Sequence, residues 1–486
     1  MLENDGGLYA AFKAKDARFD GRFFVGISST KIYCRPVCRA KQPKAENCTF
    51  YLTAAEAEQA GYRPCLLCRP ELAPGISRVD STASLAHRAA RMLEKDCGEG
   101  ESLEELADRL GCSARHLRRA FKAEYNVSPV QYLQTCKLLL AKSLLTDTDL
   151  SVLEVAMASG FGSLRRFHDL FKKHYHLTPV DLRKRASDEK KCDVGITLAL
   201  GYRPPYRWEE ILKFLDGRAI SGIELVKNEE YLRAVRLTTK NEKYRYGWIR
   251  VGHMPEKNIL TITLNETLLP VLPRVLARIR HLFDLYCNPD VVYETLSSMN
   301  DINPGFCVLG TRLPGCFDSF EMAVRAVLGQ QVTVKAASTL AARIVETHGQ
   351  PIQTGIEGLT HVFPSPEEIL ALGDDIENHF GALGVTASRS RTIYELARMI
   401  MQGEINLDFC QDPEEEMKKL MTIRGIGSWT AQYIAMRAME WTDAFLETDV
   451  GIKRALGSGT SNELLEMAEA WRPWRSYATV NLWNTL

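Results

Sequence analysis

Two features that many proteins carry are missing from this chain of 486 residues. No run of apolar residues approaches the roughly 18–20 that a membrane-spanning helix requires. The first residues, MLENDGGLYAAF, lack the basic segment followed by an apolar segment that is typical of a secretory signal peptide. We therefore expect a cytoplasmic protein with no membrane partner.

The chain also lacks a net charge, since 61 Lys and Arg residues balance 61 Asp and Glu residues, and 45% of its residues are apolar. These values exclude a disordered or fibrous protein. The length predicts roughly three domains, each with its own core. Residues 1–191 nevertheless carry 31 basic and 24 acidic side chains, and this excess indicates a polyanionic partner for the front of the chain.

Thirteen cysteines in a reducing compartment are not expected to form a disulfide framework. Four of them follow the patterns Cys-x3-Cys and Cys-x2-Cys, namely Cys34, Cys38, Cys65 and Cys68. Two such pairs can present four thiolates to one Zn2+. Arg35 and Arg39 lie beside the first pair, and a thiolate among cations near a phosphodiester backbone could also be a nucleophile. The spacing alone leaves a structural and a reactive zinc site open.

The strings FFVGISSTKIYCRPVCRAK and GYRPCLLCRP resemble the zinc domain of Ada-type methylphosphotriester-repair proteins over about residues 8–75. The resemblance implies that Cys34 irreversibly accepts the methyl group of an alkylated backbone phosphate, while the other three cysteines complete the zinc site. Cys48 matches no ligand position. Methylation would remove one negative charge from the site, and the weaker repulsion from phosphates would raise the affinity for DNA.

Residues 82–187 read as helical and contain a repeat, in which LADRLGCSARHLRRAFKAEYNVSPVQYL aligns with VAMASGFGSLRRFHDLFKKHYHLTPVDL. In each copy a glycine permits a tight turn between two helices, which predicts a pair of helix-turn-helix units. The second copy resembles AraC-type DNA-binding domains, which implies recognition helices near residues 113–124 and 163–175 in successive major grooves. Five side chains are expected to reach phosphates or guanine edges, with a solvated helix face as the alternative: Arg115, Arg118, Arg119, Arg165 and Arg166.

From residue 194 the pattern turns β-like, in ITLALGY, ELVKNEEYLRAVRL and NILTITLNE, and from about residue 268 it is almost wholly helical. Gly425 and Gly427 predict a tight hairpin between two helices, and the free amides of the second helix can bind a DNA phosphate without base preference. Asp449 follows 22 residues beyond Gly427 in an apolar context. A carboxylate there can stabilise the positive charge of a breaking glycosidic bond or activate water.

Residues 194–486 resemble the helix-hairpin-helix glycosylases, and among them the bacterial 3-methyladenine DNA glycosylase II family, in YRPPYRWEEILKFL, RLPGCFDSFEMAVRAVLGQQV, RGIGSWTAQYIAMR and WRPWRSYATVNLW. The resemblance implies a flipped alkylated base, whose positive charge is selected by electron-rich rings. It places the catalytic acid at Asp449, rather than at the nearby Asp443 or Glu447. The implied pocket residues are Phe214, Trp429, Tyr433 and Trp483.

The same resemblance implies three finer features. Trp429 stands where lyase-type relatives carry a Schiff-base lysine, so we expect a monofunctional enzyme that uses water. Gln331 stands at the position of the wedge that enters the duplex. The main-chain carbonyls of Met421, Ile423 and Ile426 are expected to hold a monovalent cation in the hairpin.

These patterns predict a mainly α, multidomain protein. The expected parts are a small zinc-stapled α+β domain (1–78), an all-α double helix-turn-helix domain (79–187), an α/β glycosylase subdomain with an antiparallel sheet (188–300) and a helix-hairpin-helix catalytic domain (301–486).

The leading hypothesis is a fused alkylation-repair protein. It would hydrolyse the N-glycosidic bond of bases such as 3-methyladenine, accept methyl groups from methylphosphotriesters in a suicidal reaction, and activate transcription of an adaptive response. We expect a monomer that binds double-stranded, alkylated and promoter DNA, and RNA polymerase. The alternative is a methylation-sensing regulator whose glycosylase half is inactive and only binds DNA. The Pro-Cys-His-Arg acceptor for O6-alkylguanine of Ada-type proteins is absent from the sequence, so that activity is not expected.

Overall fold

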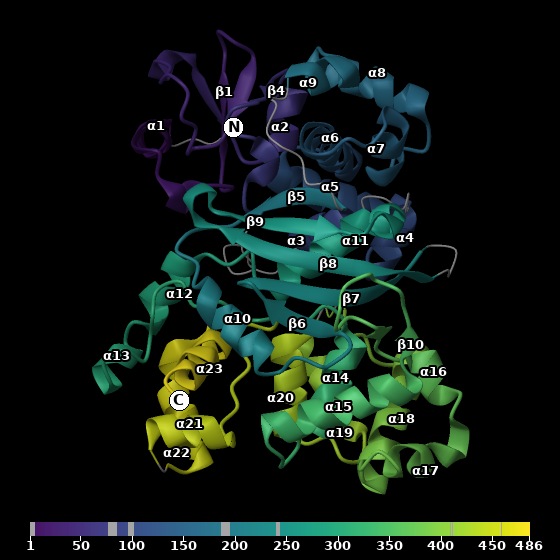
Figure 1. Cartoon of the computed structure of the whole chain (residues 1–486). Coiled ribbons are helices and arrows are strands. Elements are labelled where there is room, and N and C mark those ends of the chain that lie inside the picture. Colours follow the sequence, from purple (N-terminus) through teal and green to yellow (C-terminus); the bar gives the residue numbers. More distant parts are fainter. Residues whose placement is uncertain are drawn as a thin grey trace.

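The computed structural model describes residues 5–75, 85–95, 102–185, 195–239, 244–408, 410, 412–457 and 459–486. They form an N-terminal domain with a small sheet, a helical domain beside it, and a C-terminal half in which a larger sheet lies between these domains and further groups of helices (Figure 1). This arrangement confirms the predicted fold class. The predicted boundaries at 78/79 and 187/188 lie outside the described residues, and the boundary at 300/301 falls inside helix α13 (Met299–Ile302).

A sheet of order β3-β1-β2-β4 organises the N-terminal domain. Strands β2 and β4 are parallel, and β1 pairs antiparallel with β2 and β3. Phe23, Val25 and Phe50 are buried in its core, which is small enough to need a further constraint. The elements are α1 (Asp5–Ala14), β1 (Phe24–Ile27), β2 (Ile32–Cys34), β3 (Cys48–Tyr51), α2 (Ala54–Gln59), β4 (Arg63–Pro64) and the 3-10 helix η3 (Pro70–Leu72).

Helices α3 to α9 form the helical domain and confirm the predicted repeat. Ser113 and Ser163 cap α5 and α8 by accepting a backbone N–H from the first turn. Phe121 and Phe171 occupy the same place in the two copies, and both are fully buried. The long helix α6 contacts helices of both units. The elements are α3 (Leu85–Lys95), α4 (Leu103–Arg109), α5 (Ala114–Tyr125), α6 (Pro129–Asp147), α7 (Val152–Ala158), α8 (Leu164–Tyr175) and α9 (Pro179–Arg185).

An antiparallel sheet of order β5-β9-β8-β7-β6 opens the C-terminal half. Strand β8 was not among the predicted strands, because Arg245 and Arg250 interrupt its apolar pattern. The elements are β5 (Ile196–Gly201), α10 (Trp208–Asp216), β6 (Glu224–Lys227), β7 (Glu230–Thr238), β8 (Tyr244–Met254), β9 (Ile259–Leu264) and α11 (Leu272–Leu282).

The edge strand β5 lies against both N-terminal domains, since it contacts η3 and α6. A Cβ atom on Gly201 would lie 1.8 Å from the carbonyl oxygen of Leu72, so only glycine permits this approach. Arg203 donates a hydrogen bond of 2.7 Å to the carbonyl of Gly75. The packing covers a sheet edge that would otherwise offer free N–H and C=O groups, and it fixes the front of the chain on the C-terminal half.

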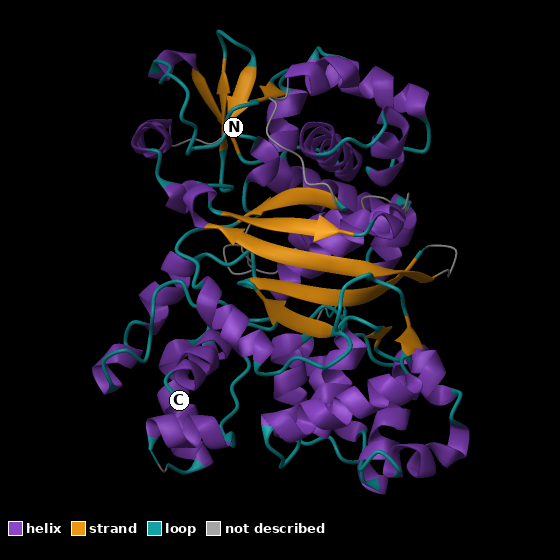
Figure 2. Ribbon diagram, in the orientation of Figure 1, coloured by secondary structure: helices purple, strands orange, loops and turns teal. Residues whose placement is uncertain are grey.

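The remaining helices form two groups, seen as separate lobes at the bottom of Figure 2. One core contains residues of α14 to α20, and the other contains residues of α12, α13 and α21 to α23. Helix α20 contributes to both cores, so it lies between the groups. No helix in the described part of the chain has the length and apolar character of a membrane span. The elements are α12 (Pro289–Leu296), α14 (Ser319–Leu328), α15 (Val334–His348), β10 (Gln350–Pro351), β11 (His361–Val362), α16 (Pro366–Leu370), α17 (Ile376–Gly381), α18 (Ala387–Met401), α19 (Pro413–Thr422), α20 (Ser428–Arg437), α21 (Val450–Leu456), α22 (Ser461–Ala468) and α23 (Arg475–Asn484).

Candidate active site and metal centre

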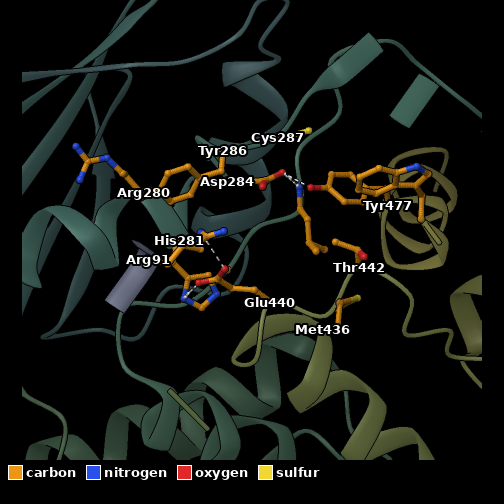
Figure 3. Close-up of a pocket in the computed structure, with 13 residues that line it drawn as sticks. Arg91, Arg280, His281, Asp284, Tyr286, Cys287, Met436, Glu440, Thr442 and Tyr477 are labelled. Atoms are coloured by element: carbon orange, nitrogen blue, oxygen red, sulfur yellow. Dashed lines mark hydrogen bonds and ion pairs between the residues drawn. The ribbon is translucent and has the colours of Figure 1, made fainter. Parts of the chain in front are cut away.

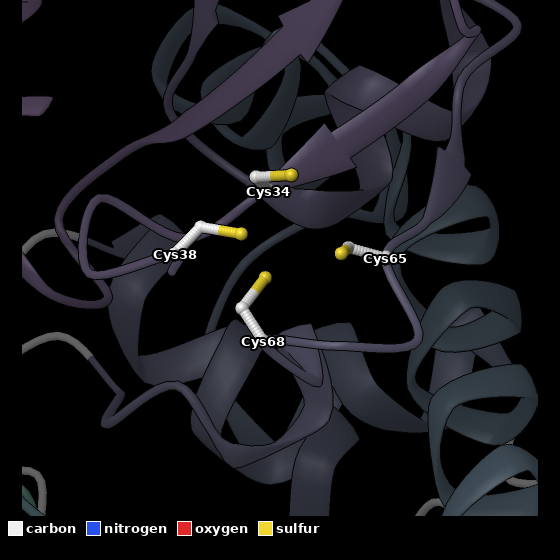
Figure 4. A group of neighbouring side chains, drawn as sticks. All are labelled: Cys34, Cys38, Cys65 and Cys68. Atoms are coloured by element: carbon white, nitrogen blue, oxygen red, sulfur yellow. The ribbon is translucent and has the colours of Figure 1, made fainter. Parts of the chain in front are cut away.

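The four predicted cysteines meet at one point of the N-terminal domain. Cys34 ends β2, Cys38 follows in the next turn, and Cys65 and Cys68 follow β4. Their Sγ atoms lie within 4.8 Å of one another, and the side chains point toward a common centre (Figure 4). A closed group of four sulfur donors is typical of a tetrahedral Zn2+ site, so this donor set fits the predicted metal.

The surroundings of the four cysteines are unequal. The backbone N–H of Arg35 donates to the Sγ of Cys68 at 3.3 Å, a contact that stabilises a thiolate. Cys34 is only 2% exposed, whereas Cys68 is partly exposed. Of the two arginines predicted to contact DNA here, Arg35 is paired with Asp20 and Arg39 is exposed. Arg39 is therefore open to a phosphate, while Arg35 supports the cluster through its backbone.

Buried polar contacts join the N-terminal domain to α6. The Oη of Tyr33, the neighbour of a cysteine ligand, donates to Glu58 Oε1 at 3.1 Å. Thr135 of α6 donates to Glu58 Oε2 at 2.9 Å. Lys142, also on α6, forms an ion pair of 2.5 Å with Glu71. The strand that carries Cys34 is thus connected to the helix that links the two helix-turn-helix units.

The buried Glu58 should make the stability of this junction depend on pH. Burial raises the pKa of Glu58 to about 8, although hydrogen bonds from Thr135, Tyr33 and Tyr175 act in the opposite direction. The folded protein therefore keeps a proton that the unfolded chain releases above its ordinary pKa of 4.5. The free energy of unfolding falls as the pH rises between these values, by up to about 1.4 kcal/mol per pH unit. We expect Glu58→Gln to remove this decline and to be more stable than the wild type at pH 8.

Denaturation midpoints measured near pH 5.5 and pH 8 check this expectation. His174 lies 3.7 Å from Glu58, and burial lowers its pKa below the ordinary value of 6.5. His174→Asn is therefore the control for a second titrating group and should leave most of the pH dependence in place. A Glu58→Gln protein with the pH dependence of the wild type would contradict the assignment.

The arginines predicted to contact DNA from the recognition helices are all exposed; they are Arg115, Arg118 and Arg119 on α5, and Arg165 and Arg166 on α8. Arg118 also contacts Glu104 at 3.3 Å, but a surface ion pair of this kind is weak and does not hold the side chain. Exposure fits a phosphate contact and a solvated helix face equally well. The DNA contacts of these side chains therefore stay predictions.

In the C-terminal half, the four aromatic side chains predicted for the base pocket come together: Phe214 from α10, Trp429 and Tyr433 from α20, and Trp483 from α23. The rings of Trp429 and Tyr433 are stacked, with centroids 5.2 Å apart and an interplanar angle of 6°. The ring centroids of Phe214 and Tyr433 each lie 6.3 Å from that of Trp483. Trp429, Tyr433 and Trp483 are half-buried, so ring faces remain partly open.

Asp449 lies next to these rings as the N-cap of α21. Its Oδ1 accepts the backbone N–H groups of Gly451 at 2.9 Å and Ile452 at 3.1 Å. The indole N–H of Trp483 donates to Oδ1 at 3.0 Å, and that of Trp429 donates to Oδ2 at 3.1 Å. Because all four donors are N–H groups, the carboxylate acts only as an acceptor. The structure thus holds this carboxylate against two of the aromatic rings.

The two other acids considered at this position have different surroundings. Asp443 is buried and pairs with Arg475 at 2.7 Å and Arg472 at 2.6 Å, which indicates a structural role. Glu447 is partly exposed, and no contact between Glu447 and the rings is found among the described residues. The geometry favours Asp449.

Two arginines that were not predicted border the aromatic rings. Arg437 is 4% exposed; its Nη1 donates to Tyr433 Oη at 2.8 Å, and its guanidinium lies 4.8 Å from the ring centroid of Phe214. The guanidinium of Arg218 lies 3.8 Å from Phe214 and 5.9 Å from Trp483. Arg437 interrupts the apolar stretch YIAMRAM, and a charge on the buried face of a helix is the signal that could have identified it.

The predicted hairpin lies between α19 and α20. Gly425 has a φ of +101°, a region that favours glycine, and its carbonyl accepts a hydrogen bond of 2.7 Å from Gln330 Nε2. Gln331 is the next residue, exposed and with a φ of 53°. The predicted wedge therefore lies beside the hairpin. Gly427 caps α20 and is exposed, which leaves the first N–H groups of α20 open to a phosphate.

The two hairpin glycines should respond differently to alanine. A Cβ atom at Gly425 would lie 2.4 Å from Thr392 Oγ1 at a positive φ, whereas a Cβ atom at Gly427 would meet nothing within 4 Å. We expect Gly425→Ala to lower the free energy of unfolding by about 1–3 kcal/mol and to weaken DNA binding, since it displaces the hairpin. The matched variant Gly427→Ala should change stability by less than about 0.5 kcal/mol. Denaturant titrations and binding of undamaged duplex DNA check both; equal stability of the two variants would contradict the geometry.

A small cavity at the junction of the helical domain and the C-terminal half is a separate feature (Figure 3). Its volume is about 40 Å³, which excludes a nucleobase. Arg91 of α3 forms an ion pair of 3.3 Å with Glu440, and its guanidinium lies 4.0 Å from the ring centroid of Tyr286. Asp284 accepts a hydrogen bond of 2.8 Å from Tyr477, and burial raises its pKa to about 6. The two contacts of Arg91 join the helical domain to the C-terminal half.

Comparison with known protein families finds matches along most of the chain. Four family models match: the metal binding domain of Ada over residues 7–71, a helix-turn-helix domain over residues 106–185, the AlkA N-terminal domain over residues 197–318, and the HhH-GPD superfamily of base excision DNA repair proteins over residues 324–469.

Three curated relatives show how these parts are combined elsewhere. The chain is 35% identical over 487 residues to the probable bifunctional transcriptional activator/DNA repair enzyme AlkA of Mycobacterium tuberculosis, which covers 98% of this chain and 96% of that protein. It is 36% identical over 286 residues to DNA-3-methyladenine glycosylase 2 of Escherichia coli, covering 59% of this chain and 96% of that protein. It is 41% identical over 122 residues to the bifunctional transcriptional activator/DNA repair enzyme Ada of Escherichia coli, covering 25% of this chain and 33% of that protein.

Proposed function

The chain belongs to the family of bifunctional transcriptional activator/DNA repair enzymes of the AlkA type, and from this premise we propose that it repairs alkylated DNA in two ways and regulates transcription. Its C-terminal half is a glycosylase that releases alkylated bases such as 3-methyladenine. Its N-terminal domain accepts methyl groups from DNA methylphosphotriesters. The observation that carries the glycosylase proposal is the carboxylate of Asp449, held by the indole N–H groups of Trp429 and Trp483.

In the glycosylase reaction the flipped base lies among the aromatic rings, whose faces favour a cationic, alkylated purine over a neutral normal base. As the bond between the base and C1′ breaks, positive charge develops on the sugar, and the fixed carboxylate of Asp449 stabilises it. A water molecule then adds its hydroxyl to C1′ and releases its remaining proton to solvent. Trp429 offers no amine for a Schiff base, so the product is an abasic site in an uncut strand.

In the methyl transfer the Sγ of Cys34 attacks the methyl carbon of the methylphosphotriester. The bond between that carbon and the phosphate oxygen breaks, which restores a phosphodiester and leaves a thioether on Cys34. Zn2+, when bound by the four cysteines, keeps their sulfurs in the thiolate form. Cys34 is buried, so the DNA must displace part of its cover. Because no group removes the methyl from the thioether, each chain reacts once.

The front of the chain also supplies sequence-specific binding. The two exposed arginine-bearing helices, α5 and α8, support contact with promoter DNA, and an activator of this kind acts on RNA polymerase. The protein acts as a monomer. We also propose that the main-chain carbonyls of Met421, Ile423 and Ile426 hold a monovalent cation in the hairpin. The carbonyl of Ile423 lies at the turn, where it accepts the N–H of Ile426 at 3.0 Å.

The test of this proposal uses the full chain and duplex DNA treated with a methylating agent. Free 3-methyladenine should appear with multiple turnovers, and labelled methyl groups should appear on the protein up to one per chain. Methyl transfer and promoter binding without any base release would instead favour the alternative, a methylation-sensing regulator whose C-terminal half only binds DNA.

A further inference from the structure

Most polar hydrogens on the rings of the aromatic pocket already have a hydrogen-bond acceptor. The indole N–H groups of Trp429 and Trp483 both donate to Asp449, and Phe214 has no polar hydrogen. The remaining polar group on the four rings is the hydroxyl of Tyr433. Whatever hydrogen bond these rings give to a bound base must therefore come from Tyr433.

The hydroxyl of Tyr433 is held by a cation that is itself fixed. Arg437 Nη1 donates to Tyr433 Oη at 2.8 Å. The other nitrogens of this guanidinium donate to the carbonyls of Pro314 at 2.5 Å and Gly315 at 2.9 Å. Arginine has no acceptor atom, so the hydroxyl oxygen is the acceptor in this bond and its own proton is not used by Arg437. No acceptor for that proton is found within the part of the chain that the structure describes.

The charges around Tyr433 favour loss of this proton. Burial raises the pKa of Tyr433, but the nearby cations Arg437, Arg218 and Arg325 outweigh burial, and the pKa lies below its ordinary value of 10. Arg218 approaches from the loop after α10, and Arg325 belongs to α14. A phenolate that forms here would therefore be paired with guanidinium groups.

Two of these cations are unfavourable for binding a positively charged base. The guanidinium groups of Arg218 and Arg437 lie over the ring of Phe214 at 3.8 Å and 4.8 Å, where they compete with a cationic base for the ring face. They also repel its charge. Their placement fits a reaction in which negative charge appears on the departing base or on Tyr433.

We propose that Tyr433 is the proton donor to a departing neutral purine base, and that Arg437 and Arg218 position and polarise it. The inference rests on the proposed glycosylase function. When the bond from N9 to C1′ breaks, its electron pair moves onto the purine. The Tyr433 proton passes to a purine ring nitrogen. Water then adds its hydroxyl to C1′ and returns a proton to the tyrosinate.

Cationic lesions do not need this step. A base such as 7-methylguanine carries a positive charge before cleavage and leaves as a neutral molecule. A neutral purine such as hypoxanthine would leave as an anion unless it is protonated. A comparison of excision rates on these two substrates therefore distinguishes the effect of proton donation from the effects of the other residues of the site, including Asp449.

The experiment compares the full-length wild type with Tyr433→Phe under single-turnover conditions, on duplexes with a single hypoxanthine or a single 7-methylguanine. Loss of a general acid typically lowers a rate by about 10²–10⁴-fold. We expect a loss in that range on hypoxanthine and a loss below about 10-fold on 7-methylguanine. Trp429→Phe is the matched control, because it removes a donor to Asp449 and should slow both substrates by a similar factor.

Three outcomes would overturn the inference. One is an equal loss of rate on both substrates in Tyr433→Phe, and another is a wild type that releases 7-methylguanine but no hypoxanthine; both leave the proposed glycosylase function intact. A wild type that releases neither base would overturn the proposed function as well. Arg218→Gln gives a second reading if Tyr433→Phe does not fold, since it also should slow hypoxanthine release more than 7-methylguanine release.

Discussion

Asp449→Asn is expected to lower the rate of 3-methyladenine release by about 10²–10⁴-fold. The substitution removes the negative charge that stabilises the developing positive charge on the sugar. The asparagine oxygen can still accept the N–H groups of Gly451 and Ile452, which start α21. The NH2 group of the asparagine, however, faces the indole N–H of Trp429, which donates to the carboxylate in the wild type. Two hydrogen-bond donors then face each other. The fold should persist while the chemistry fails.

The measurement is single-turnover base release at matched folded concentration, judged by the thermal transition of each protein. Asp443→Asn is the control, because Asp443 is a neighbouring acid whose carboxylate is occupied by Arg472 and Arg475. It should lower stability and leave the rate per folded molecule within about 10-fold of the wild type. Loss of activity in Asp443→Asn with full activity in Asp449→Asn would refute the assignment of the acid.

The sequence was most informative where a residue pattern and a family resemblance coincided. Asp449, Trp429 and Trp483 are far apart in the chain, and the structure joins them by hydrogen bonds of 3.0 Å and 3.1 Å. The repeat in the helical domain predicted its two units, because a glycine turn and a buried phenylalanine recur at equivalent positions. The roles of these residues remain predictions, but their proximity is a property of the structure.

Other features depend on contacts between distant segments and leave no local pattern. Gly201 is an ordinary strand residue in the sequence, yet it is required by the carbonyl of Leu72 from another domain. Arg35 reads as a DNA contact because it lies among cations, but Asp20 pairs with it in the fold. Arg218 belongs to a polar turn, DGR, and nothing in that turn shows that its guanidinium lies over Phe214. In each case the partner is fixed by tertiary packing.

Cys34→Ser is expected to abolish methyl transfer from methylphosphotriester DNA, from one methyl group per chain to none. A hydroxyl is a far weaker nucleophile than a thiolate and is not ionised at neutral pH. Base release should continue, because the aromatic pocket and Asp449 are built from other elements. The measurement is the amount of labelled methyl on the protein, together with zinc content and the release of 3-methyladenine.

Two further serine variants separate the nucleophile from the metal site. Cys48 lies outside the four-cysteine cluster, where its Sγ donates to the carbonyl of Lys44 at 3.4 Å, so Cys48→Ser should keep both zinc and transfer. Cys68→Ser removes one sulfur ligand just as Cys34→Ser does, and should lower zinc affinity to a similar degree while retaining some transfer.

Because Cys34 is buried, the experiment must also identify which cysteine carries the transferred methyl group. If exposure in the free protein decided reactivity, the partly exposed Cys68 would be methylated before Cys34, which is 2% exposed. Peptide mass spectrometry after reaction distinguishes the two. A methyl group on Cys34 means that DNA contact uncovers this sulfur. Hydrogen bonds connect Tyr33, the neighbour of Cys34, through Glu58 to Thr135 of α6. A movement that uncovers Cys34 would then act directly on the helix that joins the two helix-turn-helix units. A methyl group on Cys68 would assign Cys34 to zinc binding alone.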